Sequence, residues 1–227
     1  MVPNPPRRRH LGYSFTVANR ADKSDSRAEL RIIGGRWRGR KLRFAADDIR
    51  PTGDRVRETL FNWLAPQLPG ARCLDMFAGS GALGIEALSR LATEVVFIER
   101  QAHAAATIED HLRTFGARPH SYTVINSDAL DVPLEKHGPF EIVFLDPPFA
   151  ADGTTNGITN DKGRDLANLC TLLENSGALA DQCLIYLEMD LADPLPPLPE
   201  HWQVSREKTA GQVRYALADR TIDDNGP

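Results

Sequence analysis

Between Pro69-Gly70 and Leu145 the chain alternates short apolar runs with amphipathic helical segments, and this alternation constrains its fold more than any other feature. Apolar runs bounded by turn signals predict strands that are buried on both faces. The predicted strands are Arg72 to Phe77, Val95 to Ile98, Tyr122 to Ile125 and Ile142 to Leu145, with helices from Ala82 and over Ala102 to Phe115. Such alternation is typical of a parallel, doubly wound α/β sheet, which binds ligands at the carboxyl ends of its strands.

The segments on either side of this core differ from it in pattern. Residues 31–44 (RIIGGRWRGRKLRF) alternate β-branched or aromatic residues with cations and glycines, which predicts a short hairpin presenting basic side chains. A helix follows, with Val56, Leu60 and Leu64 on one face and Thr52 as the predicted cap of its start. Further strands are predicted at Leu184 to Leu187, Trp202 to Ser205 and Gln212 to Leu217, the last two as a closing pair.

We therefore divide the chain into four parts. Residues 1–28 and 221–227 are predicted tails, 29–69 a basic hairpin and helix, and 70–220 the catalytic domain. The segment 150–163 is rich in Gly, Thr and Asn and is predicted to be a long loop beside the active site.

Composition limits where the protein works and what it binds. Hydrophobic residues make up 41% and charged residues 26% of the chain, which is typical of a folded soluble protein. No apolar run approaches the ~18 residues that cross a bilayer, and three distant cysteines suggest neither a disulfide framework nor a CxxC metal site. We expect a cytoplasmic monomer that neither binds a membrane nor needs a metal.

Charge is distributed unevenly along the chain. Residues 1–60 hold 15 Lys+Arg against 7 Asp+Glu, whereas the remainder holds 12 against 24. A basic arm beside an acidic body is expected where the arm meets phosphates, because neutralising them releases counterions. The alternative is a solvated basic tail without a partner.

The glycine-rich segment CLDMFAGSGALG indicates a nucleotide-type cofactor. Gly79, Gly81 and Gly84 have the G-x-G-x-x-G spacing between a strand and a helix, which lets a ligand approach the backbone. The same spacing fits a nicotinamide dinucleotide. Asp75 favours a cationic ligand instead, because an acid just before the glycines would repel a pyrophosphate but suits the ammonium and sulfonium groups of S-adenosylmethionine.

Two further acids extend this predicted cofactor site. Glu99 ends the next strand, where a carboxylate can accept hydrogen bonds from both ribose hydroxyls of an adenosine. Asp128 follows the third strand and is placed to accept a hydrogen bond from the adenine amino group. The alternative for Asp128 is a surface turn or a helix cap.

The predicted catalytic element is Asp146-Pro147-Pro148-Phe149, at the carboxyl end of the fourth strand. Two prolines stiffen this segment and remove two donors, so the carbonyls and the Asp146 carboxylate present only acceptors to an amine. Accepting the two hydrogens of a base amino group would localise its lone pair toward the methyl donor. Phe149 is expected to stack on the flipped base.

In combination these segments resemble a known family. The D-P-P-F element after a D-x-F-A-G-S-G loop is similar to the amino methyltransferases of the seven-strand class, and RIIGGRWRGRKL, RPTGDRVRETLFNWL, LDMFAGSGALGIEALSR and REKTAGQVRYAL resemble the bacterial 16S ribosomal RNA guanine-N2 methyltransferases of the small-subunit methyltransferase D type. The resemblance runs from about Arg31 to Arg220. It implies a Rossmann-like seven-stranded sheet with an antiparallel C-terminal strand, and methylation of one guanine in 16S rRNA within an assembling small subunit.

The resemblance also implies roles for individual residues. Those assigned to S-adenosylmethionine are Asp75, Phe77, Gly79, Ser80, Gly81, Glu99, Arg100, Ser127, Asp128 and Ala129, and those assigned to catalysis are Asp146, Pro147, Pro148 and Phe149. Those assigned to RNA contact are Arg36, Arg38, Arg40 and Lys41, with Arg50, Thr52, Arg55 and Arg57 at the entrance to the site. For Arg57 an ion pair with an acid beside the core is the alternative.

Three other functions remain open at this stage. D-P-P-F also serves adenine N6 methylation of DNA or RNA, and the glycines alone allow a nicotinamide oxidoreductase. An RNA-binding assembly factor without activity is the third, although Asp75 and the intact Asp146-Pro147-Pro148-Phe149 element disfavour the last two.

Overall fold

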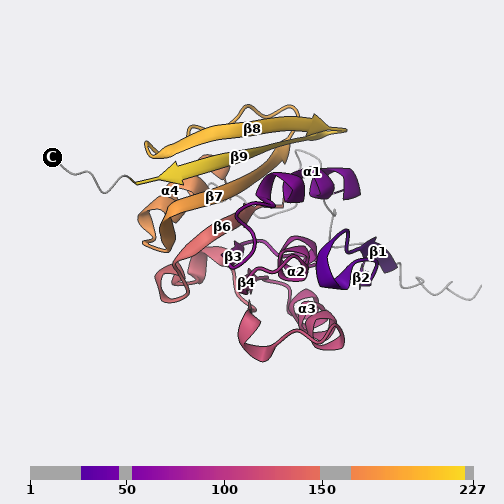
Figure 1. The fold of residues 1–227 in the computed structure, drawn as a ribbon. Helices are drawn as coiled ribbons and strands as arrows, with labels where there is room; N and C mark the ends of the chain where they lie inside the picture. Colours follow the sequence, from indigo (N-terminus) through magenta and orange to yellow (C-terminus); the bar gives the residue numbers. More distant parts are fainter. Residues whose placement is uncertain (1–26, 46–52, 149–164, 223–227) are drawn as a thin grey trace, which may run out of the picture.

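Seven strands form a mixed sheet with helices on both faces, and a two-stranded hairpin lies beside it (Figure 1). The computed structural model describes residues 27–45, 53–148 and 165–222. The sheet strands are β3 (Arg72–Asp75), β4 (Glu94–Ile98), β5 (Tyr122–Ile125), β6 (Phe140–Leu145), β7 (Leu179–Asp190), β8 (Trp202–Ala210) and β9 (Val213–Thr221). The helices are α1 (Asp54–Leu64), α2 (Ala82–Ser89), α3 (Ala102–Thr114) and α4 (Leu166–Asn175).

The strand order is β5-β4-β3-β6-β7-β9-β8. Strands β3 to β7 are parallel, while β9 runs antiparallel to both β7 and β8. The chain leaves the centre in both directions from β3, which has β4 on one side and β6 on the other. Doubly wound sheets bind ligands at such a reversal, at the carboxyl ends of the strands. The predicted Rossmann-like sheet with an antiparallel C-terminal strand is confirmed.

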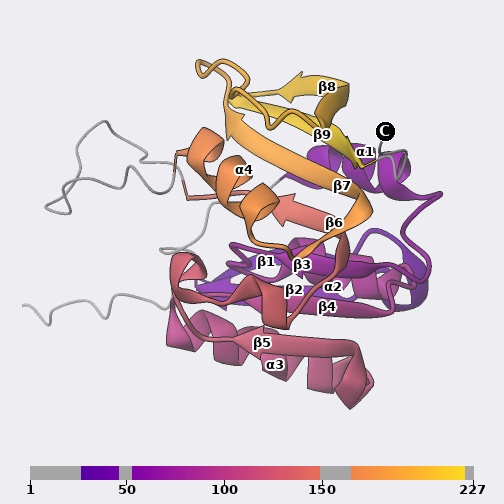
Figure 2. The same ribbon diagram turned by 90° about the vertical axis from the view of Figure 1, so that its left-hand side faces the viewer.

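The side chains of the parallel strands pack alternately into two apolar layers, because successive residues of a strand point to opposite faces of the sheet. Cys73, Phe97 and Phe144 pack with α1, α2 and α3 on one face. Leu74 and Val143 pack on the other face with α4 and the short 3-10 helices η3 (Ala129–Asp131) and η4 (Leu134–Lys136). Figure 2 shows α4 on the face opposite to α2 and α3. Burial on both faces explains why these strands have nearly continuous apolar sequences.

The N-terminal hairpin pairs β1 (Arg27–Arg31) with β2 (Lys41–Ala45), in register from Arg31↔Lys41 outward. The predicted hairpin is thus present, and the turn between its strands contains the 3-10 helix η1 (Gly35–Trp37). Gly53 is the N-cap of α1 and has no side chain with which to cap the helix. The proposed cap Thr52 lies outside the described residues.

Several element boundaries differ from the sequence prediction. Strand β3 ends at Asp75 and not at Phe77, because the chain turns there into the glycine loop. Strands β7, β8 and β9 are longer than predicted, since β-pairing continues where the apolar pattern fades: β8 is exposed from Ser205 to Thr209 yet stays paired with β9. None of the described helices combines the length and the apolar character needed to cross a membrane.

Candidate active site

Glycines shape the loop between β3 and α2. Gly79 has φ 51° and Gly81, the N-cap of α2, has φ 74°, a region that side chains with a Cβ rarely adopt. A Cβ on Gly84 would lie 2.2 Å from the Phe97 ring of β4. The first two glycines therefore bend the loop, and the third lets α2 pack closely against the sheet.

Asp75 ends β3 beneath this loop and is buried, with 3% of its surface exposed. Its Oδ2 accepts a hydrogen bond from the Gly84 N–H at 2.9 Å. The pKa of Asp75 is raised to about 7, because burial and, to a smaller extent, the negative charge of Glu99 raise it more than the Gly84 hydrogen bond lowers it. A cation placed beside this carboxyl group would favour its charged form.

Glu99 follows β4 and ties two loops together. Its carboxylate accepts from the Gly79 N–H at 2.8 Å and from the Gln101 N–H at 2.7 Å. Each carboxylate oxygen has a second lone pair, so both can still accept a hydroxyl hydrogen. Asn126, to which the sequence analysis gave no role, donates from Nδ2 to the carbonyls of Glu99 and Arg100 at 2.9 and 3.0 Å. The sequence signal that could have identified Asn126 is its position directly after β5, at the carboxyl end of a parallel strand.

The other predicted cofactor residues lie around this loop to different depths. Asp128 caps η3 and accepts from the Leu130 N–H at 3.1 Å, which is the cap considered as its alternative role. Ser80 and Ala129 are buried, Phe77 and Ser127 are half-buried, and Arg100 is exposed. The cofactor roles of these residues remain predictions.

Asp146 directly follows β6 and is half-buried, Pro147 is buried and Pro148 is exposed. Phe149 lies outside the described residues. Phe144 is the Cα partner of Asp75 in the β3–β6 pair, so Asp146 lies two residues further along, at the carboxyl edge of the sheet. Two acceptors, the Asp146 carboxylate and the Pro147 carbonyl, are adjacent along the chain at this edge.

Glu188 was missed by the sequence analysis. It lies in β7 with 5% of its surface exposed, and Tyr186 Oη donates to its Oε2 at 2.6 Å. Burial raises the pKa of Tyr186 well above its usual range, and the charges of Glu188 and Asp146 raise it further, so this hydroxyl stays protonated. The sequence could not show that Glu188 lies near Asp146, because their proximity depends on the pairing of β6 with β7.

The registers bring these acids to one face of the sheet, near the carboxyl ends of its strands. Phe97, Asp75, Phe144 and Tyr186 are aligned across β4, β3, β6 and β7. Glu99, Asp146 and Glu188 each lie two residues beyond this line, on the same face. We call the four acids Asp75, Glu99, Asp146 and Glu188 the acidic edge.

The acidic edge fits one of the two cofactors that the glycine loop allows. Buried carboxylates at the first turn of α2 disfavour a pyrophosphate and suit a ligand with an ammonium and a sulfonium group. Asp75 and Glu99 can hold such a ligand with the backbone of Gly79 and Gly81. Within residues 27–45, 53–148 and 165–222, no group of three or more His, Cys, Asp or Glu is arranged to hold a metal ion.

The hairpin is anchored to α2 by buried polar groups. The Glu86 carboxylate, fully buried, accepts from the N–H groups of Ile33 and Gly34, both at 2.7 Å. Ser89 Oγ accepts from the Trp37 N–H at 2.9 Å and donates to the Gly34 carbonyl at 2.6 Å. A Cβ on Gly35 would lie 1.9 Å from the Ser89 carbonyl oxygen, so close docking requires glycine there.

Arg57 belongs to this anchor and not to the surface. Its side chain has no exposed area and donates to the Arg31 carbonyl at 2.9 Å and to Asp54 at 2.6 Å. Its Nη1 also lies 3.8 Å from Glu86 Oε2. The ion pair considered as the alternative for Arg57 is therefore present, and the buried side chain is not exposed to contact RNA.

The other hairpin cations are exposed. Arg36 lies over the Trp37 ring at 4.2 Å, Arg38 and Lys41 face solvent, and Lys41 pairs with Glu29 at 2.7 Å. Arg55 is exposed near the start of α1. Arg50 and Thr52, also predicted to contact RNA, lie outside the described residues.

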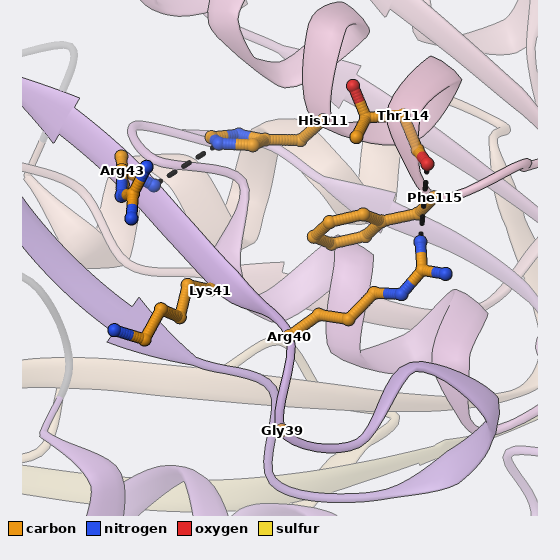
Figure 3. Close-up of a pocket in the computed structure, with 7 residues that line it drawn as sticks. All are labelled: Gly39, Arg40, Lys41, Arg43, His111, Thr114 and Phe115. Atoms are coloured by element: carbon orange, nitrogen blue, oxygen red, sulfur yellow. Dashed lines mark hydrogen bonds between the residues drawn. The ribbon is translucent and has the colours of Figure 1, made fainter.

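A pocket of about 580 Å³ lies between β2 and the end of α3 (Figure 3). Arg40 donates to the Thr114 carbonyl at 3.2 Å and lies 5.0 Å from the centre of the Phe115 ring. The Arg43 N–H donates to His111 Nε2 at 3.1 Å. Lys41 and Arg43 add two more cations to this lining, and both pair with Glu29, which is not one of the lining residues. This surface can attract polyanions.

Comparison with known proteins places this geometry in a family. The family model described as "Conserved hypothetical protein 95" matches residues 30–219. The "Ribosomal RNA small subunit methyltransferase D" of Escherichia coli K12 is 47% identical over 193 residues (85% of this chain, 90% of the relative), and that of Haemophilus influenzae is 41% identical over 196 residues (85% and 95%). The solved structure of the E. coli protein yhhF has a TM-score of 0.71 and 44% identity, covering 86% of this chain and 100% of that one. The chain therefore belongs to this family, which includes the small-subunit rRNA methyltransferase D proteins.

Proposed function

We propose that this protein transfers a methyl group from S-adenosylmethionine to the exocyclic N2 amino group of one guanine in 16S rRNA. The single observation that carries the proposal is the acidic edge, in which Asp146 and Pro147 follow Phe144, the Cα partner of Asp75 on the neighbouring strand. The names of the relatives, small-subunit rRNA methyltransferases, support the substrate class.

The chemistry requires a nitrogen that is a poor nucleophile to react. The lone pair of a base amino group is delocalised into the ring, and acceptors for both of its hydrogens restore it to the nitrogen. Asp146 and the Pro147 carbonyl supply these acceptors, and Asp146 accepts the proton that the amino group loses on methylation. S-Adenosylmethionine, when bound, supplies a methyl group activated on a positively charged sulfur.

The cofactor and the RNA are proposed to approach from different parts of the fold. Asp75, Glu99 and the glycine loop hold the cofactor, while Arg36, Arg38, Arg40 and Lys41 on the hairpin contact phosphates. Since the hairpin docks on α2, which directly follows the glycine loop, RNA bound there lies on the same domain as the reacting groups. We propose that the protein acts as a monomer in the cytoplasm, on an assembling small-subunit particle.

The test is to follow label from methyl-tritiated S-adenosylmethionine into RNA from a strain that lacks this protein. Deproteinised 16S rRNA and purified small-subunit particles are the two substrates, and digested nucleosides are identified by mass spectrometry. We expect N2-methylguanosine at a single position, with faster transfer to the particle. Label in N6-methyladenosine, or no label in either substrate, would overturn the proposal.

A further inference from the structure

We propose that Glu188 determines the specificity of this site for guanine over adenine, by accepting a hydrogen bond from N1–H of the target base. The inference rests on the proposed function and deepens it, because it names the part of the base that the protein reads. Both bases carry an exocyclic amino group that Asp146 and Pro147 would accept, so another contact must separate them.

The first step is the position of Glu188 relative to Asp146. In the parallel β6–β7 pair Leu145 is the Cα partner of Leu187, so the next residues along the two strands are Asp146 and Glu188. Neighbouring strands lie about 4.8 Å apart, and both residues continue the face of Phe144 and Tyr186. The two carboxylates are therefore adjacent at the carboxyl edge of the sheet, within reach of a single planar base.

The second step is the way in which Glu188 is fixed. Tyr186 donates to one carboxylate oxygen at 2.6 Å, and the Tyr186 ring packs against Tyr215, which in turn contacts Trp63 of α1. Because Tyr186 keeps its proton, the bond has one direction, with Glu188 as the acceptor. A carboxylate has several lone pairs and no donor, so Glu188 can accept more than one hydrogen bond at the same time.

The third step is the edge of the base. In guanine the N2 amino group is flanked by N1–H, so a second donor lies next to the reacting nitrogen. In adenine the N6 amino group is flanked by N1 without hydrogen, whose lone pair would face the carboxylate. A site that accepts an N–H discriminates against an analogue that lacks it, because the hydrogen bond is lost and the N1 lone pair then faces the carboxylate. An acceptor beside Asp146 therefore favours guanine.

The experiment compares two enzymes on two RNA substrates. Wild type and Glu188→Gln are assayed on an RNA whose target position holds guanine or 2-aminopurine, which keeps the N2 amino group but has no hydrogen on N1. Glutamine keeps the length of the side chain and an acceptor for Tyr186, and its amide can donate to the bare N1. Since 2-aminopurine also lacks O6, the informative quantity is the change in the ratio of kcat/KM between the enzymes, in which the loss of O6 cancels.

We expect wild type to prefer guanine by about a hundredfold or more, and Glu188→Gln to reduce this ratio at least about tenfold, by slowing guanine and accelerating 2-aminopurine. Tyr186→Phe is the control for packing, since it keeps the carboxylate and should keep a preference for guanine. If Glu188→Gln slows both substrates by the same factor, Glu188 is only structural and the inference is wrong. Equal use of both bases by wild type, which needs no variant, also overturns it. Failure of wild type to methylate the guanine substrate would overturn the proposed function itself.

Discussion

The acidic edge and the hairpin surface, which we define as Arg36, Arg38, Arg40 and Lys41, carry opposite charges and differ in burial. The acids Asp75, Glu99 and Glu188 are buried, and each accepts hydrogen bonds from the protein. Arg36 and Arg40 are exposed and lie on aromatic rings. Chemistry at one atom needs groups fixed in place, whereas attraction of a polyanion needs only charge of the right sign nearby. In this molecule the charges proposed for methyl transfer are mostly buried, and those proposed to attract RNA are exposed.

The largest expected effect comes from removing the reacting acceptor. We predict that Asp146→Ala lowers kcat for methyl transfer about a thousandfold or more, because an acceptor at the reacting nitrogen is lost. Affinity for S-adenosylmethionine, measured by calorimetry, should stay within a few-fold, since Asp75 and Glu99 are intact. Asp146→Asn keeps the shape of the side chain and one acceptor, so its kcat should lie between those of wild type and Asp146→Ala. Undiminished turnover of Asp146→Ala would show that the acidic edge is not the site of transfer.

The next effect tests a buried acid outside the acidic edge. Glu86→Ala leaves the Ile33 and Gly34 N–H groups without their acceptor and Arg57 without a nearby buried countercharge. We expect the free energy of unfolding, measured in urea, to fall by about 3 kcal/mol. Glu109→Ala, at an exposed position on α3, is the matched control and should change it by less than about 0.5 kcal/mol. Equal stability of the two variants would mean that the hairpin is not anchored through Glu86.

The third prediction uses the pKa of Asp75, which burial raises to about 7. Because a cationic ligand favours the ionised form, affinity for S-adenosylmethionine should be about tenfold weaker at pH 6 than at pH 8. Asp75→Asn should bind weakly at both pH values and remove this dependence. A wild-type affinity that does not vary over this range would contradict the assignment.

The same group gives a change in stability with a defined sign. The unfolded chain releases the Asp75 proton near the ordinary pKa of 3.8, whereas the folded protein keeps it until about pH 7. The free energy of unfolding therefore falls as pH rises through this window. Asp75→Asn should consequently be more stable than wild type at pH 8, with the gain shrinking toward pH 4, and thermal unfolding of both proteins without ligand measures this.

The smallest effect for each residue is expected on the hairpin surface. Replacing Arg36, Arg38 and Arg40 by Ala should weaken RNA binding a few-fold for each residue. It should also lower the slope of log affinity against log salt by about 0.7 to 0.9 for each phosphate that the protein no longer neutralises. Arg206→Ala with Lys208→Ala, exposed on β8, is the matched control. A salt slope unchanged from wild type would show that the hairpin cations are only solvated.

Patterns that are local in the sequence predicted the fold well. Apolar runs gave β3 to β6, and the glycine spacing gave the turn into α2, because both depend on neighbouring residues. The sequence assigned Gly34 and Gly35 to a hairpin only. The structure shows that position 35 requires glycine, because Ser89, more than fifty residues away, packs directly against it. A close approach between distant segments leaves no periodicity that sequence reasoning can find.

Residue chemistry was predicted better than residue environment. Arg57 and Arg55 have the same charge two positions apart, but α1 buries one and exposes the other. The sequence pattern allowed either role for Arg57, and its pairing with Asp54 and the Arg31 carbonyl became visible only with the helix and hairpin in place. The charge asymmetry of the chain therefore overstated the number of cations available to a partner.

The amino-acid sequence alone determined a doubly wound sheet, a glycine loop for a cofactor, and an acid followed by two prolines at a strand end, since each is written in consecutive residues. The tertiary structure decided that Glu188 lies beside Asp146 and that Glu86 and Arg57 join the hairpin to the core. The reason is that strand register and helix docking bring together residues far apart in the chain. Burial then decides whether a charge is held for chemistry or left to solvent.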